Sequence, residues 1–94
     1  MSKLNSLLHQ ELRLSIISFL AGIDSAADFK KLMEVTGATK GNLSVQISKL
    51  QAANYITVSK TFKGNYPHTE CTITKLGRTE FDTYLNDLKK LLNL

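Results

Sequence analysis

The chain has 94 residues, of which 43% are hydrophobic and 21% charged, a composition typical of a globular domain with one core. A chain of this length buries only ~60 to 65% of the surface that its unfolded form exposes. A large internal substrate cavity is therefore disfavoured, and we expect a second subunit to contribute to stability. The single Cys71 excludes an internal disulfide, and His9 and His68 form no metal-ligand cluster, so we expect neither a metal nor a cofactor.

No apolar run approaches the ~18 residues that a membrane span requires, and residues 1–6 lack a basic segment followed by an apolar one. These observations predict a cytoplasmic protein without membrane association. We find no linker, repeat or low-complexity tract, and we therefore expect one domain over residues 1–94.

The net charge of +4 lies entirely in the middle third of the chain. Segments 1–36 and 70–94 each balance their basic and acidic residues, whereas segment 37–69 has no acidic residue and holds Lys40, Lys49, Lys60 and Lys63. Such segregation indicates a surface that faces a polyanion. The alternative is that the acidic residues are absent from this segment by chance, and the charge alone does not decide between the two interpretations.

The first expected helix runs from Leu4 to Ala21 and carries apolar residues on two sides at helical spacing. One stripe covers the core, and the other is expected to meet a second subunit through Leu7, Leu14 and Ile17. Gly22 is expected to end this helix. A second helix then begins at Asp24 or Ser25, where Ser25 and Asp28 resemble a capping box.

Gly37 is expected to end the second helix in the left-handed conformation, and Thr39 is a suitable N-cap for a third helix reaching about Ala53. Its apolar stripe consists of Leu43, Ile47 and Leu50. The opposite face is small and polar, without the Glu–Lys pairs typical of an unused solvated helix face.

Segments 55–62 and 69–73 are β-branched and aromatic, and the turn residues between them predict a β-hairpin with an exposed basic tip. Cys71 alternates with Ile73 and is expected in the core. Thr74 caps a last helix to about Leu92, whose apolar stripe is longer than one small core can use. Its expected dimer contacts are Tyr84, Leu85, Leu88, Leu91 and Leu92.

Two short helices joined through residues 36–39 and followed by a hairpin predict a mainly α fold, the winged helix-turn-helix, with the third helix in the major groove of double-stranded DNA. The candidate contacts of this recognition helix are Thr39, Lys40, Asn42, Ser44, Val45, Gln46, Ser48 and Lys49. The candidate contacts of the wing, with backbone or minor groove, are Lys60, Lys63, Gly64, Asn65 and His68.

Two other interpretations remain open. Domains of three helices and a hairpin also serve as protein-docking modules, and Cys71 could be a redox-sensing thiol. An enzymatic role finds no support, because the five glycines form no phosphate-binding pattern and no nucleophile motif is present.

The segment DFKKLMEVTGATKGNLSVQISKL, the start of a strand at Tyr55 and the later Ile73-Thr74-x-x-Gly77-Arg78 carry a family resemblance. The chain resembles the short single-domain winged-helix transcriptional regulators of the MarR and ArsR type. The resemblance implies a homodimer built from segments 1–22 and 74–94, which binds a pseudo-palindromic operator, usually as a repressor. Because 94 residues leave no room for a separate effector domain and metal-ligand sets are missing, any small-molecule effector is expected at the dimer interface.

Overall fold

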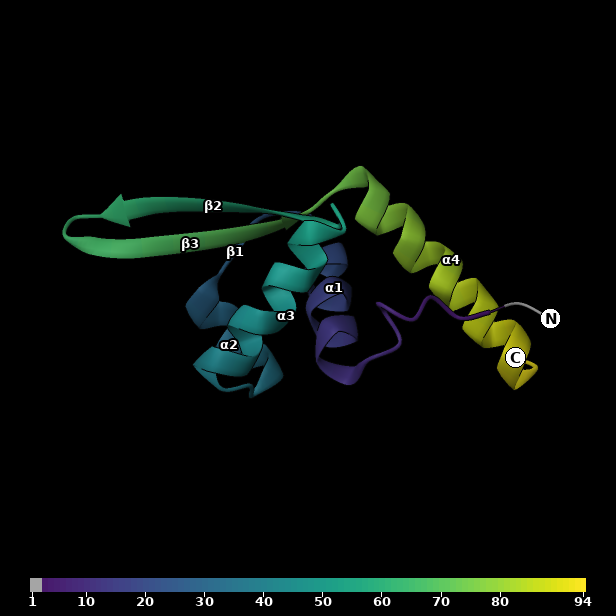
Figure 1. Cartoon of the computed structure of the whole chain (residues 1–94). Coiled ribbons are helices and arrows are strands. Elements are labelled where there is room, and N and C mark those ends of the chain that lie inside the picture. Colours follow the sequence, from purple (N-terminus) through teal and green to yellow (C-terminus); the bar gives the residue numbers. More distant parts are fainter. Residues whose placement is uncertain (1–2) are drawn as a thin grey trace.

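The computed structural model describes residues 3–94 of the chain, whose elements follow in the order α1, β1, α2, α3, β2, β3 and α4 (Figure 1). Helix α1 spans Glu11–Ile23, strand β1 Ala27–Asp28, helix α2 Phe29–Thr36 and helix α3 Lys40–Ala52. Strands β2 (Ile56–Lys63) and β3 (Tyr66–Ile73) form a hairpin, and helix α4 spans Lys75–Leu92. Met1 and Ser2, with which the expected 1–94 domain and its dimerisation segment 1–22 begin, lie outside the described residues.

Helices α1, α2 and α3 form the body of the molecule, from which the hairpin extends to one side and α4 to the other (Figure 1). The elongated shape measures 51 × 25 × 21 Å along its principal axes. The expected winged helix-turn-helix, mainly α with a small sheet, is confirmed. Within residues 3–94, no helix is long and apolar enough to cross a membrane.

Helix α1 begins at Glu11 and not at Leu4, which corrects the expected boundary. The side-chain oxygen of Asn5 accepts hydrogen bonds from the backbone N–H groups of Leu7 and Leu8, at 2.9 and 3.1 Å, and so stabilises a local turn in place of helix. This turn still buries Leu8 completely. At the other end α1 continues through Gly22 to Ile23, and Asp24 ends it with a left-handed φ of 52°.

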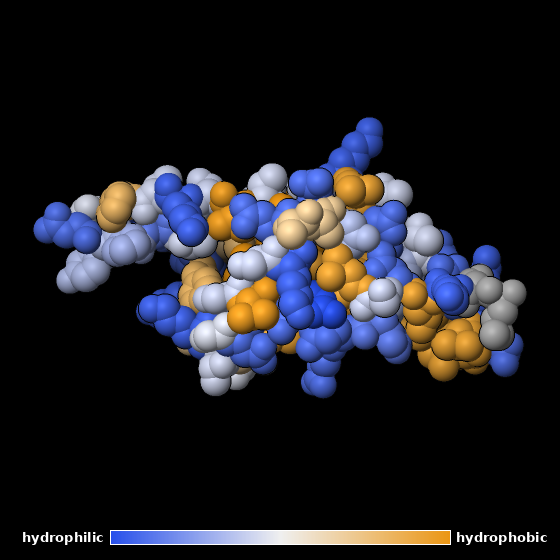
Figure 2. All heavy atoms as spheres, viewed as in Figure 1, coloured by the Kyte–Doolittle hydropathy of each residue, from blue (hydrophilic) through white to orange (hydrophobic). Residues whose placement is uncertain are grey.

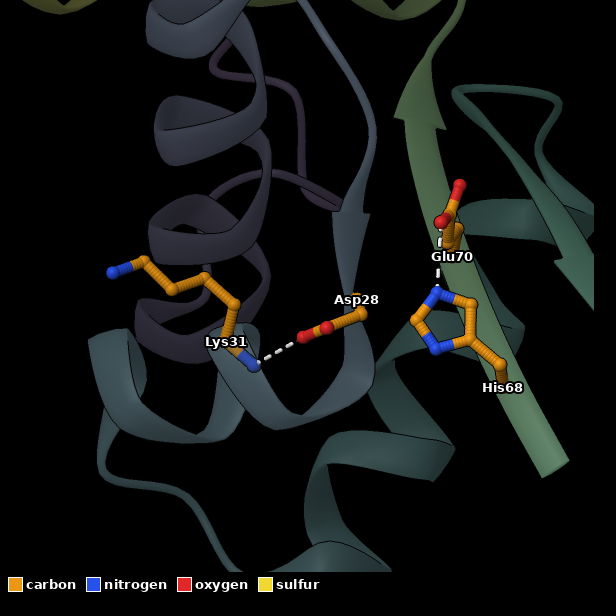
Figure 3. Close-up of polar contacts among 4 residues, drawn as sticks. All are labelled: Asp28, Lys31, His68 and Glu70. Atoms are coloured by element: carbon orange, nitrogen blue, oxygen red, sulfur yellow. Dashed lines mark hydrogen bonds and ion pairs between the residues drawn. The ribbon is translucent and has the colours of Figure 1, made fainter. Parts of the chain in front are cut away.

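Helix α2 begins later than expected, because Asp28 is its N-cap and no capping box forms at Ser25. The Asp28 carboxylate accepts the backbone N–H of Lys31 at 2.7 Å (Figure 3). Asp28 is also the second residue of the short strand β1, which no sequence pattern indicated. Strand β1 pairs antiparallel with β3 and gives a three-stranded sheet in the order β1-β3-β2.

The remaining boundaries agree with the predictions to within a residue or two, except that β3 begins three residues before the expected Thr69. Thr74 caps α4 by accepting the N–H of Gly77 at 2.9 Å, and Asn54 adopts a left-handed φ of 64° after α3. The core lies among α1, α2, α3 and the base of the hairpin, and α4 contributes a tyrosine to it. Its buried side chains are Leu8, Ile16, Ile17, Leu20, Ala27, Leu32, Leu43, Ile47, Leu50, Ile56, Cys71 and Tyr84.

Candidate nucleic-acid interface

The turn between α2 and α3 is built by two local devices. Gly37 ends α2 with a φ of 70°, and its N–H donates to the Met33 carbonyl at 2.8 Å. Thr39 then caps α3, where its hydroxyl oxygen accepts the N–H of Asn42 at 3.2 Å. Both caps agree with the sequence predictions, and together they set the start of α3 against the body.

Helix α3 has one buried and one exposed side. Leu43 and Leu50 are completely buried and Ile47 nearly so, which fixes the inward face. The outward face is small, polar and basic, and it contains every candidate contact of this helix except one. These exposed residues are Thr39, Lys40, Asn42, Ser44, Val45, Ser48 and Lys49.

The exception is Gln46, which is only 8% exposed. Its Oε1 accepts a hydrogen bond from Arg13 Nη1 at 2.5 Å, and its Nε2 donates to Asn42 Oδ1 at 3.1 Å. Unlike the other candidate contacts of α3, Gln46 therefore presents almost no surface to a ligand, and both of its polar atoms are engaged within the chain. The sequence did contain a signal for this, because Gln46 lies three residues after Leu43 and four before Leu50, on the apolar stripe itself.

The hairpin has two different faces, because residues paired across an antiparallel ladder share a face. Val58 pairs with Cys71, Lys60 with Thr69 and Phe62 with Pro67, and this face turns toward α3 near the body. Strand β3 begins at Tyr66, so the tip is a tight turn at Gly64 and Asn65, and the expected loop over 63–68 is wrong. The Gly64 φ of 63° fits the first central position of a II′ turn.

An open groove of about 440 Å³ lies between α3 and the hairpin. It joins the two candidate contact surfaces, because Lys40, Ser44 and Ser48 of α3 line it together with Lys60 of β2. Lys49, Lys63, Gly64 and Asn65 are also exposed. The four lysines of the acid-free segment 37–69 thus lie on α3 and β2.

His68 was expected on the wing surface, but its side chain is only 14% exposed and contacts Glu70 at 2.7 Å (Figure 3). Because Nε2 of His68 contacts the Glu70 carboxylate, this nitrogen is not free to donate a hydrogen bond to a ligand. The sequence prediction missed two other side chains near the tip. Phe62 at the end of β2 is 74% exposed, and Tyr66 at the start of β3 is 78% exposed.

The candidate dimer residues divide by their burial within the single chain. Ile17 and Tyr84 are buried in the core, so they offer no surface to a second subunit. The Tyr84 hydroxyl also lies 2.8 Å from His9 Nδ1. Leu7, Leu14, Leu85 and Leu88 are half-buried, whereas Leu91 and Leu92 at the end of α4, and Leu94 just after it, are exposed. Figure 2 shows apolar side chains gathered at this end of the molecule.

The thiol of Cys71 is completely buried in the core. Burial raises the pKa of this thiol from 9.0 to about 11, which keeps it protonated and unreactive near neutrality. This environment argues against a redox-sensing cysteine. Within residues 3–94, no three His, Cys, Asp or Glu side chains are grouped to hold a metal ion.

A helix-turn-helix with an exposed basic α3 and a β-hairpin wing defines the winged-helix class of DNA-binding domains. The chain belongs to the winged helix DNA-binding domain family, whose sequence profile matches residues 12–92. A search of curated proteins gave no match.

Solved structures of transcriptional regulators are similar to this chain. A transcriptional regulator homologue from Pyrococcus horikoshii OT3 has a TM-score of 0.84 and 29% identity over 93% of this chain and 85% of its own. The putative regulator YtfH of Salmonella typhimurium has a TM-score of 0.74 and 20% identity, covering 90% of this chain and 76% of its own. A putative MarR-family regulator of Porphyromonas gingivalis W83 has a TM-score of 0.73 and 16% identity, covering 89% of this chain and 79% of its own. The family and these neighbours support a DNA-binding transcriptional regulator and not an enzyme.

Proposed function

We propose that the protein is a homodimeric repressor that binds a pseudo-palindromic operator, with α3 in the major groove and the wing on the flanking DNA. The observation that carries this proposal is the outward side of α3, which is exposed, acid-free and continuous with the wing through a groove lined by lysines. A duplex presents one phosphate charge per ~1.7 Å, so such a surface is complementary to it.

The small residues of α3 support close approach to the base edges. At Gly41 no heavy atom beyond the adjoining residues and backbone of α3 itself lies within 4 Å of the position that a Cβ would occupy, so this side of the helix is open to a groove about 12 Å wide. Val45 is 50% exposed and offers methyl groups suited to the thymine methyl. Lys40 and Lys49 carry the charge expected of phosphate contacts, which position the helix without reading sequence.

The apolar end of α4 supports the homodimer. Leu91 and Leu92 are 55% and 54% exposed, and Leu94 is 88% exposed. A second copy that covers this end, together with half-buried Leu85 and Leu88, would remove a patch that water otherwise contacts. The two α3 helices of such a dimer should then lie about 34 Å apart, one turn of DNA, and the bound dimer would block polymerase sterically.

The salt dependence of DNA binding tests the proposal directly. A dimer brings two copies of Lys40, Lys49, Lys60 and Lys63, so the slope of log affinity against log salt should approach, but not exceed, about −7. Fluorescence anisotropy with labelled genomic duplexes measures it. A slope near zero, or no binding at low salt, would refute a DNA-binding role and favour a protein-docking module.

A matched pair of variants locates the interface. Lys49→Gln should weaken binding to all sequences and reduce the slope by about 2 per dimer, because one phosphate contact is lost per subunit. Lys89→Gln removes the same charge from the exposed side of α4 and should leave the slope unchanged. Equal effects of the two variants would contradict the proposed orientation.

Dimerisation is tested separately by analytical ultracentrifugation at micromolar concentration. The wild type should sediment as a dimer, and Leu91→Lys should shift it toward the monomer by placing a charge in the apolar contact. A monomeric wild type would contradict the homodimer. Repression is tested by in vitro transcription from a promoter that contains the selected operator, where added protein should lower transcript yield.

A further inference from the structure

The hydrogen bonds around buried Gln46 form a connected path from α1 to the exposed side of α3. Arg13 on α1 donates through Nε to the Leu7 carbonyl at 2.6 Å and through Nη1 to Gln46 Oε1 at 2.5 Å. Gln46 Nε2 donates to Asn42 Oδ1 at 3.1 Å. Asn42 is exposed one turn earlier on α3, among the candidate base contacts.

The guanidinium of Arg13 determines the orientation of both amides along this path. A guanidinium has only donors, so Gln46 must turn its single acceptor, Oε1, toward Arg13. Its NH₂ group is then forced toward Asn42, and a donor can only be met by the Asn42 acceptor, Oδ1. The second bond of Arg13, to the Leu7 carbonyl, holds the planar guanidinium at two points and reduces its freedom to rotate.

The consequence lies at the exposed end of the path. The bond from Gln46 turns Oδ1 of Asn42 inward, so the group that the side chain presents outward is the Nδ2 amino group, which carries two donor hydrogens. In the major groove, guanine presents two acceptors, N7 and O6, whereas cytosine presents only the N4 amino donor. A fixed amino donor therefore favours guanine and opposes cytosine at the base that it meets.

We propose that Arg13 and Gln46 are positioning residues that fix the Asn42 amide with its amino group outward, so that Asn42 selects an acceptor-bearing base, guanine above cytosine, at one position in each half-site. This inference rests on the proposed DNA-binding function. It adds a specificity determinant from α1 and from the buried side of α3, neither of which touches DNA.

The substitution Gln46→Glu reverses the direction of the hydrogen bond between residues 46 and 42. A carboxylate still accepts from Arg13, but it cannot donate, so the Asn42 amide must rotate to give its amino group to Glu and turn Oδ1 outward. Selection from a pool of random-sequence duplexes should then favour cytosine over guanine at the same position, each preference being about tenfold. Gln46→Met, similar in size but without hydrogen bonds, should relax the preference without reversing it.

Three controls separate positioning from a structural role. Asn42→Ala should lose the preference at that one position and keep the others, because its side chain is exposed. Arg13→Met should relax the preference as Gln46→Met does. The salt slope of Gln46→Met should equal that of the wild type, since no phosphate contact is removed, and thermal unfolding monitors the fold of each variant.

The outcomes are distinguishable. A wild type that selects no sequence refutes the proposed function and, with it, this inference. If the wild type prefers guanine and Gln46→Glu keeps that preference, the positioning path is overturned and the DNA-binding function stays intact. The same conclusion follows if Asn42→Ala keeps the guanine preference of the wild type. If Gln46→Glu fails to fold, Gln46→Met and Arg13→Met are compared with Asn42→Ala. A weaker base preference at the same position in all three variants supports the path. An unchanged base preference in Gln46→Met and Arg13→Met overturns it.

Discussion

Gly77 lies where the first turn of α4 crosses the chain that leaves α3. A Cβ at this position would lie 2.1 Å from the Tyr55 carbonyl oxygen and 3.1 Å from Ile73 Cγ1. The carbonyl cannot easily retreat, because it also accepts the backbone N–H of Thr74 at 3.0 Å. Gly77→Ala should therefore strain a backbone contact that no side-chain rotation can relieve.

The size of the effect follows from opposing contributions. Alanine is better than glycine in a helix by about 1 kcal/mol, whereas overpacking costs about 1 to 3 kcal/mol or more, and a weakened backbone hydrogen bond adds about 1 kcal/mol. At the upper end of the overpacking range, which a backbone contact this short warrants, we expect Gly77→Ala to lower the free energy of unfolding by about 2 to 3 kcal/mol. In a domain of this size the midpoint of thermal unfolding should fall by about 10 to 20 °C.

Gly22 provides the matched control, because it is also helical and no heavy atom lies within 4 Å of its Cβ position. Gly22→Ala should stabilise the protein by about 0.5 to 1 kcal/mol through helix propensity alone. Circular dichroism melts of both variants and the wild type, at one protein concentration, measure the shifts. Shifts of the same sign would refute the steric reasoning at Gly77.

Three further predictions concern single positions. Asn54 has a φ of 64°, so Asn54→Ala should cost about 1 kcal/mol in urea unfolding while Asn54→Gly should not destabilise. Burial raises the pKa of Cys71 from 9.0 to about 11, so the unfolded thiol ionises first as pH rises. Below pH 9 the thiol is protonated in both states, so its contribution to the free energy of unfolding is fully present. Between about pH 9 and 11 the free energy of unfolding of the wild type should fall by up to about 2 to 3 kcal/mol relative to that of Cys71→Ala. A constant difference between the two proteins across that range would contradict the buried thiol. Tyr66 and Phe62 are 78% and 74% exposed, so their alanine variants should unfold within about 0.5 kcal/mol of the wild type, and a larger loss would mean that the wing tip folds back onto the body.

The parts of the fold that could be predicted from the sequence depend on neighbours in the chain. Thr39 and Thr74 cap the helices that follow them, and Gly37 ends α2, because each acts on backbone groups within four residues. Strand β1 was missed because its two residues carry no periodicity and pair with β3 more than forty residues later. The start of α1 was wrong because Asn5 stabilises a turn within an apolar segment whose spacing is typical of a helix.

In the candidate interface too, features set by nearby residues could be predicted, and features set by residues far away in the sequence could not. The exposed positions on α3 follow from helical spacing, and the charge of segment 37–69 follows directly from its four lysines and its lack of acidic residues. The burial of Gln46 follows from its place on the apolar stripe of α3, but its hydrogen bond to Arg13 could not be predicted, because Arg13 lies 33 residues earlier. Ile17 and Tyr84 were assigned to a subunit contact because the sequence does not reveal how much apolar surface one chain can bury by itself.

The placement of charge along the fold has a kinetic consequence. The excess lysines lie on α3 and β2, while segments 1–36 and 70–94 are each neutral, so the excess positive charge gives the monomer an electric dipole with its positive end at the recognition surface. In the field of a duplex, this dipole exerts a torque that turns α3 and the wing toward the phosphates before contact. Added salt should therefore slow association much more than it speeds dissociation, and the search for an operator would begin with molecules already oriented.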